Sequence, residues 1–201
     1  MRAYLLIVLA AAACGDNSAG DDQPVDPSGA AAYRGYAAVQ DELYAKFVAD
    51  GQPFELFDYL GTNGDDLSKL VGRPDGFGAG FEPGATTPNA MNVLVWRMML
   101  RAFAHDLAAS CPQSSLTPVS LEADALSATA QPVVLGVCAW PASDQAVGAA
   151  WDYVVGVRAP AASRAAFIQM VHGLATSETP NDGIADLWTA ALLHPSFLLE
   201  Q

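Results

Sequence analysis

The longest helical pattern in the sequence runs from residue 88 to residue 110 and is apolar on most of its faces. Thr87 can cap the start of this helix, with Pro88 at its first position, and Pro112 disfavours helical geometry just beyond its end. At about 100° per residue, apolar side chains cover more than half of its circumference. They are Met91, Val93, Val95, Met98, Met99, Leu100, Ala102, Phe103 and Leu107. We expect such a helix to be buried between its neighbours.

Shorter helical patterns lie on both sides of this central helix. Apolar residues recur at three- and four-residue spacing in 30–50, 53–60, 121–130, 132–140, 144–155, 163–175 and from 180 onward. Ser120, Ser143 and Thr179 can cap three of these segments, and Gly156 can end the segment 144–155. Strand patterns are almost absent. The sequence therefore predicts an all-α fold, a compact single-domain bundle of about six to eight helices around the central helix 88–110.

Composition agrees with one well-buried domain. The chain has 201 residues, of which 52% are hydrophobic, and no internal repeat is present. Its formal net charge is -13, and only nine Lys and Arg residues are spread along it. Such a chain lacks the basic patch that nucleic acids or anionic lipid surfaces require, so no nucleic-acid partner is predicted.

The amino terminus has the pattern of a signal peptide, which we assign to residues 1–13. Arg2 precedes the apolar run 4–13, which is too short to span a bilayer. Small residues then lead directly into Cys14, and this segment resembles the lipobox of bacterial lipoproteins, in which the cysteine is lipidated and becomes the mature N-terminus. Ala11 stands where that pattern usually has leucine, so signal cleavage nearby without lipidation stays open.

The lipobox resemblance implies an exported protein that is held in the bacterial cell envelope by acyl chains on Cys14. Gly15 at the next position implies sorting to the outer membrane. Residues 15–29 are polar and acidic and cannot fold alone, so 14–29 are interpreted as the lipidated cysteine and a flexible tether. A calcium-binding loop formed by the aspartates of this segment is the alternative. The helical domain is then 30–201.

Cysteine usage predicts one disulfide. If Cys14 is lipidated, Cys111 and Cys138 remain, and each lies at a predicted helix end beside a proline-limited turn. In an exported protein these two residues are expected to pair. Two buried free thiols are the alternative.

A polar strip on the central helix carries the candidate site. Arg97, Arg101 and His105 share this strip, and Glu82 lies just before the helix. Two guanidiniums on a buried helix need partners, so at least one arginine is predicted to form a bidentate pair with a carboxylate of the preceding segment. The candidate carboxylates are Asp65, Asp66, Asp75 and Glu82. In the alternative, both arginines extend into solvent.

No cofactor, metal ion or catalytic residue is predicted. The three histidines lie on different predicted helices without the i, i+4 pair of zinc proteases, and no G-x-S-x-G motif is present. The glycine-rich run 76–80 lacks the preceding strand and following helix of a phosphate-binding loop. Acid–base, metal and nucleotide chemistry therefore have no motif to support them.

The C-terminal segment 188–200 carries a second resemblance. Its helix, proline break and Phe-Leu pair resemble helical domains of unknown function that accompany c-type cytochrome domains in large bacterial exported proteins. His194 stands where that pattern has serine, and no C-x-x-C-H haem-attachment motif exists in the chain. The resemblance implies an exported helical protein and assigns no chemistry to it.

Two functional interpretations follow. In the first, the chain is a membrane-anchored exported lipoprotein whose helical domain binds another envelope protein or serves as an assembly subunit. In the second, it is an enzyme or redox-associated subunit with a small-molecule site at the glycine-rich segment 72–84, Arg97, Arg101 and His105. An exposed apolar patch over a filled core would favour the first, and a concave pocket where Arg97 meets the glycine-rich segment the second.

Overall fold

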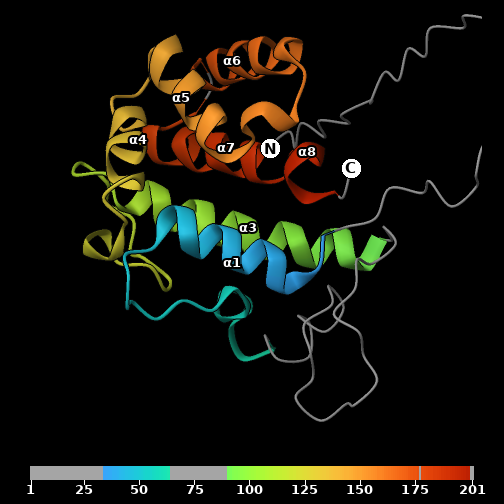
Figure 1. The fold of residues 1–201 in the computed structure, drawn as a ribbon. Helices are drawn as coiled ribbons and strands as arrows, with labels where there is room; N and C mark the ends of the chain where they lie inside the picture. Colours follow the sequence, from blue (N-terminus) through green and yellow to red (C-terminus); the bar gives the residue numbers. More distant parts are fainter. Residues whose placement is uncertain (1–33, 64–89, 177, 200–201) are drawn as a thin grey trace, which may run out of the picture.

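The computed structural model describes residues 34–63, 90–176 and 178–199, and Figure 1 shows them as a bundle of helices. These residues form seven α-helices and three 3₁₀ helices and contain no strand. The elements are α1 (Tyr36–Phe47), η1 (Leu56–Asn63), α3 (Ala90–Ala109), η2 (Ala123–Ala125), α4 (Ala130–Val137), α5 (Asp144–Val154), η3 (Gly156–Arg158), α6 (Ala161–Ala175), α7 (Pro180–Leu192) and α8 (Pro195–Leu198). The predicted all-α bundle is confirmed.

Helix α3 lies at the centre, as its sequence pattern predicts. It packs most extensively against α7, with η1 and α1 on its other sides (Figure 1). Three aromatic rings join these helices, since Phe47 of α1 meets Phe103 of α3 at 5.4 Å and Trp188 of α7 at 5.8 Å, in both cases edge to face. Each ring is fully buried, and such burial stabilises by about 1.5–3 kcal/mol per side chain.

Local capping signals place several helix ends where the sequence predicts them. The Ser143 hydroxyl accepts the N–H of Ala146 at 3.3 Å at the start of α5. The Thr179 hydroxyl does the same for Asp182, also at 3.3 Å, at the start of α7. Gly156 follows the end of α5 with a φ of 58°, a conformation that favours glycine.

The predicted helix 121–130 is wrong, because only the short η2 forms there. The carboxylate of Asp106 on α3 accepts the backbone N–H groups of Val119, Ser120 and Leu121 at 2.6–2.9 Å. Those three donors are therefore occupied by a distant side chain and Ser120 does not begin a helix.

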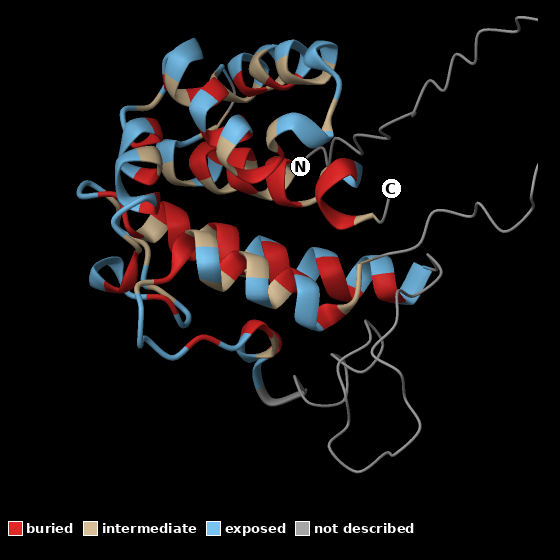
Figure 2. Cartoon of the chain, viewed as in Figure 1, coloured by how far each residue is buried: buried red, intermediate tan, exposed pale blue. Residues whose placement is uncertain are grey.

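The N-terminal half of α3 is less buried than its sequence pattern predicts. Met91, Val93 and Met98 were expected in the core but are 52%, 44% and 42% exposed. At this end the neighbouring helices cover the opposite side of α3, where Val95 and Trp96 are buried. Figure 2 shows the resulting alternation of buried and exposed positions along α3. The start of this helix at Thr87 and Pro88 lies outside the described residues. No described helix is long and apolar enough to cross a membrane.

Candidate functional site

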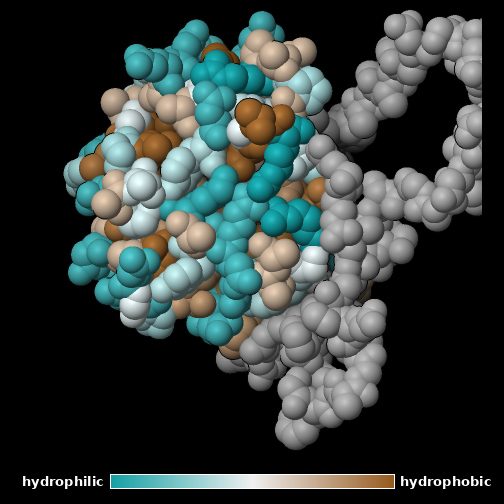
Figure 3. Space-filling model, in the orientation of Figure 1, coloured by the Kyte–Doolittle hydropathy of each residue, from teal (hydrophilic) through white to brown (hydrophobic). Residues whose placement is uncertain are grey.

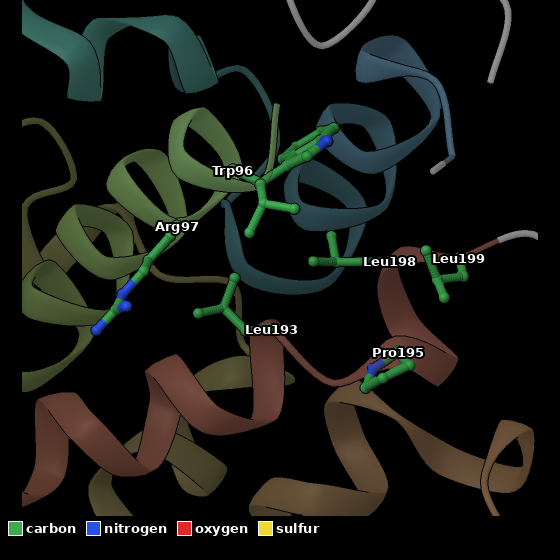
Figure 4. A pocket seen from close by; sticks show the side chains of 7 residues that line it. Trp96, Arg97, Leu193, Pro195, Leu198 and Leu199 are labelled. Atoms are coloured by element: carbon green, nitrogen blue, oxygen red, sulfur yellow. The ribbon is translucent and has the colours of Figure 1, made fainter. Parts of the chain in front are cut away.

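A pocket of about 160 Å³ opens between the N-terminal half of α3 and the turn that joins α7 to α8. Figure 4 shows how side chains from the two elements face each other across it. Its lining consists of Val93, Trp96, Arg97, Leu193, Pro195, Leu198 and Leu199. Six of these seven residues are apolar or aromatic, so the pocket can bind a small apolar group and has one charged side chain to orient it.

The C-terminal wall exists because α7 stops and the chain starts helix α8 almost at once. Pro195 occupies the first position of α8, and Nδ1 of His194 accepts the N–H of Ser196 at 3.2 Å. The His194 ring packs against Trp151 with its centroid 4.7 Å away, and burial lowers the pKa of this histidine. This turn holds Leu193 and Leu198 against α3.

On the α3 side, Trp96 and Arg97 differ in burial. The Trp96 side chain is 1% exposed and stacks on Tyr36 of α1 with ring centroids 6.4 Å apart. Arg97 is exposed and stands at one end of the pocket, with Leu199 at the other (Figure 4). It forms no ion pair within the described residues. Its guanidinium extends away from the other lining side chains (Figure 4), so it lies at the rim of the pocket and can reach only a group that stays outside.

The predicted polar strip proves to be part of the protein surface. Arg97 and Arg101 are both exposed, so the expectation that they lie on a buried face is wrong. His105 is partly exposed, and its Nδ1 lies 3.7 Å from Oδ1 of Asp106. The predicted carboxylate partners, Glu82 included, lie outside the described residues. The predicted bidentate pair with that segment stays a prediction.

An exposed apolar stripe lies on the N-terminal half of α3, the helix that also lines the pocket. Met91, Leu94 and Met98, which we call the α3 patch, follow one another at three- and four-residue spacing and are 52%, 49% and 42% exposed. Val93 lines the pocket and is itself 44% exposed, so it connects the pocket with the surface. On the face seen in Figure 1, the described surface is mostly hydrophilic, with separate apolar spots (Figure 3).

The cysteine pair is placed as the sequence predicts. The Sγ atoms of Cys111 and Cys138 are 1.99 Å apart, which is a disulfide distance. Cys111 follows the end of α3 and Cys138 caps the end of α4, so the bond joins these two helix ends. Both residues are buried and lie far from the pocket in the bundle.

The sequence reasoning missed an ion cluster around Glu42 of α1. Its carboxylate lies 2.6 Å from Arg34, 2.9 Å from Arg158 and 3.2 Å from Lys46. Burial would raise the pKa of Glu42, but hydrogen bonds from Arg158 and Arg34 and the charges of Arg34 and Lys46 outweigh it and hold the pKa below its ordinary value. Lys46 also donates to the carbonyls of Tyr153 and Val154 at the end of α5. This cluster ties helices together and is structural.

The described residues hold no group of three or more histidine, cysteine or acidic side chains arranged to bind a metal ion. Among the described residues, Glu178 has a carboxyl pKa raised by burial and by the neighbouring Asp186 and Asp182, which outweigh the charge of Arg101. These acids lie on and just before α7, away from the residues that line the pocket. None of them lines the pocket.

The sequence identified one half of the pocket and missed the other. Arg97 was singled out because of its charge, whereas the turn after α7 was not considered as a wall. The signal was present in the apolar residues Leu193, Pro195, Leu198 and Leu199, which continue after α7 has ended. Compared with models of known protein families, with curated proteins and with solved structures, the chain matches none. Function must therefore be argued from this geometry.

Proposed function

We propose that this protein is a membrane-anchored exported lipoprotein whose helical domain docks another envelope protein through the α3 patch and the adjoining pocket. One observation carries the proposal. Three large apolar side chains at helical spacing, Met91, Leu94 and Met98, are 52%, 49% and 42% exposed on the helix that also lines an apolar pocket. Contiguous exposed apolar surface of this kind marks interaction sites.

The composition of the patch supports docking of a protein segment. Methionine side chains are flexible and adapt to irregular partner surfaces. About half of each side chain is already buried, so complete burial by a partner would contribute about 1 kcal/mol per residue. Three such residues plus the pocket can support an interface of modest affinity.

The envelope location rests on the sequence. The signal-peptide pattern of residues 1–13 and the lipobox-like approach to Cys14 support export, acylation and placement at the outer membrane. A disulfide between Cys111 and Cys138 is compatible with such an oxidising compartment. The proposed partners are thus the membrane, through the lipid anchor, and a second envelope protein.

The second candidate, an enzyme or redox-associated subunit, has one observation in its favour, because Arg97 does line a pocket. The other lining side chains offer no acid, base or nucleophile. The glycine-rich segment 72–84, which this candidate requires, lies outside the described residues. Binding is consequently the better supported activity.

Site-specific photo-crosslinking tests the docking proposal. A photoreactive amino acid replaces Met91 in the full chain, expressed in its native membranes. The matched control replaces Leu135 of α4, which is apolar and 42% exposed but lies at the other end of the bundle (Figure 1). A discrete crosslinked protein at position 91 that is absent at 135 supports the proposal. Identical patterns at the two positions would contradict it.

A further inference from the structure

We infer that the pocket between α3 and the α7–α8 turn holds one leucine- or phenylalanine-sized side chain of the partner, while a carboxylate on the same or the next residue pairs with Arg97. The pocket and the arginine are features of this chain, and only the source of the side chain rests on the proposed function. The inference specifies the chemistry that this site recognises, which the docking proposal leaves open.

The size of the pocket sets the size of the group. Its volume of about 160 Å³ is close to that of an engineered cavity of roughly 150 Å³, lined by aliphatic and aromatic residues, that binds benzene. A phenyl ring or a leucine side chain therefore fills it. A full acyl chain is too long to be enclosed there.

The walls select an apolar group. Val93 and the Trp96 ring form one side and Leu193, Pro195 and Leu198 the other, so hydrocarbon makes up most of the surface that an entering group meets. A buried polar group without a hydrogen-bond partner is unfavourable, whereas an apolar one gains from leaving water. The enclosed part of the ligand is therefore hydrocarbon.

Arg97 adds a requirement for negative charge next to that hydrocarbon. Its guanidinium is exposed at one end of the pocket and forms no ion pair within the described residues. It carries several N–H donors in a planar fork that matches a carboxylate. Arg101, one turn further along α3, is also exposed, but its charge acts on Glu178 and opposes the rise of the Glu178 pKa, so of these two Arg97 is the cation left for a partner group. In a chain of net charge -13, Arg97 marks the place where an anionic partner group is attracted.

Two probes that differ only in charge test the inference. N-acetyl-leucine carries the carboxylate, and N-acetyl-leucinamide carries a neutral amide in its place. Each is titrated into the detergent-solubilised full chain while the methyl NMR signals of Val93 and Leu198 are followed. We expect both signals to shift and saturate in the millimolar range, with the carboxylate probe binding about two- to fivefold more tightly, as an exposed ion pair allows.

Two variants at exposed positions test which residue causes the preference for the charged probe and which lines the binding site. Arg97→Gln should remove the difference between the probes and leave binding of the amide unchanged. Val93→Phe should fill the pocket and abolish the shift of Leu198 with either probe. Because Arg97 is a surface residue, its variant keeps the test valid even if Val93→Phe alters the fold. Absence of methyl shifts, or equal affinity of the two probes for the wild-type protein, overturns the inference.

The same variants separate this inference from the docking proposal. If the crosslink at position 91 forms but neither Val93→Phe nor Arg97→Gln weakens it and the probes do not bind, the pocket chemistry is wrong and docking stands. If the probes bind as expected and no crosslink forms, the pocket is a site for small carboxylates and the docking proposal is wrong.

Discussion

At the scale of single residues, Asp106 fixes the backbone of residues 119–121, an effect that its position in the helical pattern of α3 does not suggest. It lies on α3, is fully buried and accepts three backbone N–H groups from residues 119–121. A buried carboxylate is tolerated when its oxygens are satisfied in this way. Burial and the charge of Asp106 also raise the pKa of the neighbouring Tyr59. Sequence periodicity treats Asp106 as a polar interruption and cannot predict its distant partners.

Replacing Asp106 tests this role. Asp106→Asn keeps the size of the side chain but exchanges one acceptor oxygen for a donor that faces backbone N–H groups. We expect a loss of about 2–4 kcal/mol in the free energy of unfolding, measured by urea denaturation. Asp124→Asn, at an exposed position in η2, is the matched control and should change stability by less than about 0.5 kcal/mol. Equal effects of the two substitutions would contradict the structural role of Asp106.

His194 makes the stability of the C-terminal wall depend on pH. Burial lowers its pKa from the ordinary value of 6.5, so the unfolded state binds the proton more readily than the folded state. Its contribution to stability is complete above about pH 6.5 and is lost as pH falls through the lower folded pKa. A proton on Nδ1 would also break the bond from the N–H of Ser196.

His194→Asn keeps a capping acceptor that does not titrate. The variant should lose less stability than the wild type when pH is lowered from about 7 to about 5, although its stability at pH 7 is reduced by the missing contact with Trp151. Urea denaturation at the two pH values measures the difference. A loss between these pH values that is the same in both proteins would show that His194 does not carry the effect.

At the scale of elements, predictions succeeded where the determining contacts are local. The capping side chains of Ser143 and Thr179 lie within a few residues of the N–H groups they accept, so α5 and α7 could be predicted from sequence. The prediction of a helix at 121–130 failed because backbone N–H groups at its start donate to Asp106, which is many positions away in the sequence. The prediction that Met91 and Met98 are buried failed because their burial depends on which side of α3 the neighbouring helices cover.

The disulfide between Cys111 and Cys138 stabilises the connection between α3 and α4. The two residues are separated by 27 positions, and closing a loop of that length restricts the unfolded chain by about 3–4 kcal/mol in the chain-entropy model. Reduction should lower the free energy of unfolding by that amount. A variant with alanine at both positions should show the lower value with and without reductant. Thiol counting on the denatured, unreduced protein should find neither cysteine reactive, and two reactive thiols would refute the pairing.

At the scale of the whole molecule, the fold class was readable because apolar residues recur with helical spacing along nearly the entire domain. Only part of the candidate site could be predicted from the sequence. Arg97 was recognised because a charge stands out on an apolar helix, but the pocket arises from the packing of α3 against the turn at residues 193–195, and such tertiary relations are not contained in local periodicity. The exposed stripe of Met91, Leu94 and Met98 has the same origin.

The anchoring of the molecule is the last prediction, and it depends on Cys14. Under the proposed function, acyl chains on this cysteine supply the attachment to the membrane. Each buried CH₂ contributes about 0.8 kcal/mol; one chain binds only marginally, whereas two or more give stable anchoring. Cys14→Ser removes the acceptor while the tether and the domain stay unchanged. We expect the variant to lose metabolic labelling with palmitate and to move from the membrane to the soluble fraction.

Because the α3 patch and the pocket are intact in this variant, probe binding should be unaffected, so a loss of the crosslink at position 91 would be a consequence of location alone. Palmitate labelling of the variant equal to that of the wild type would refute lipidation at Cys14.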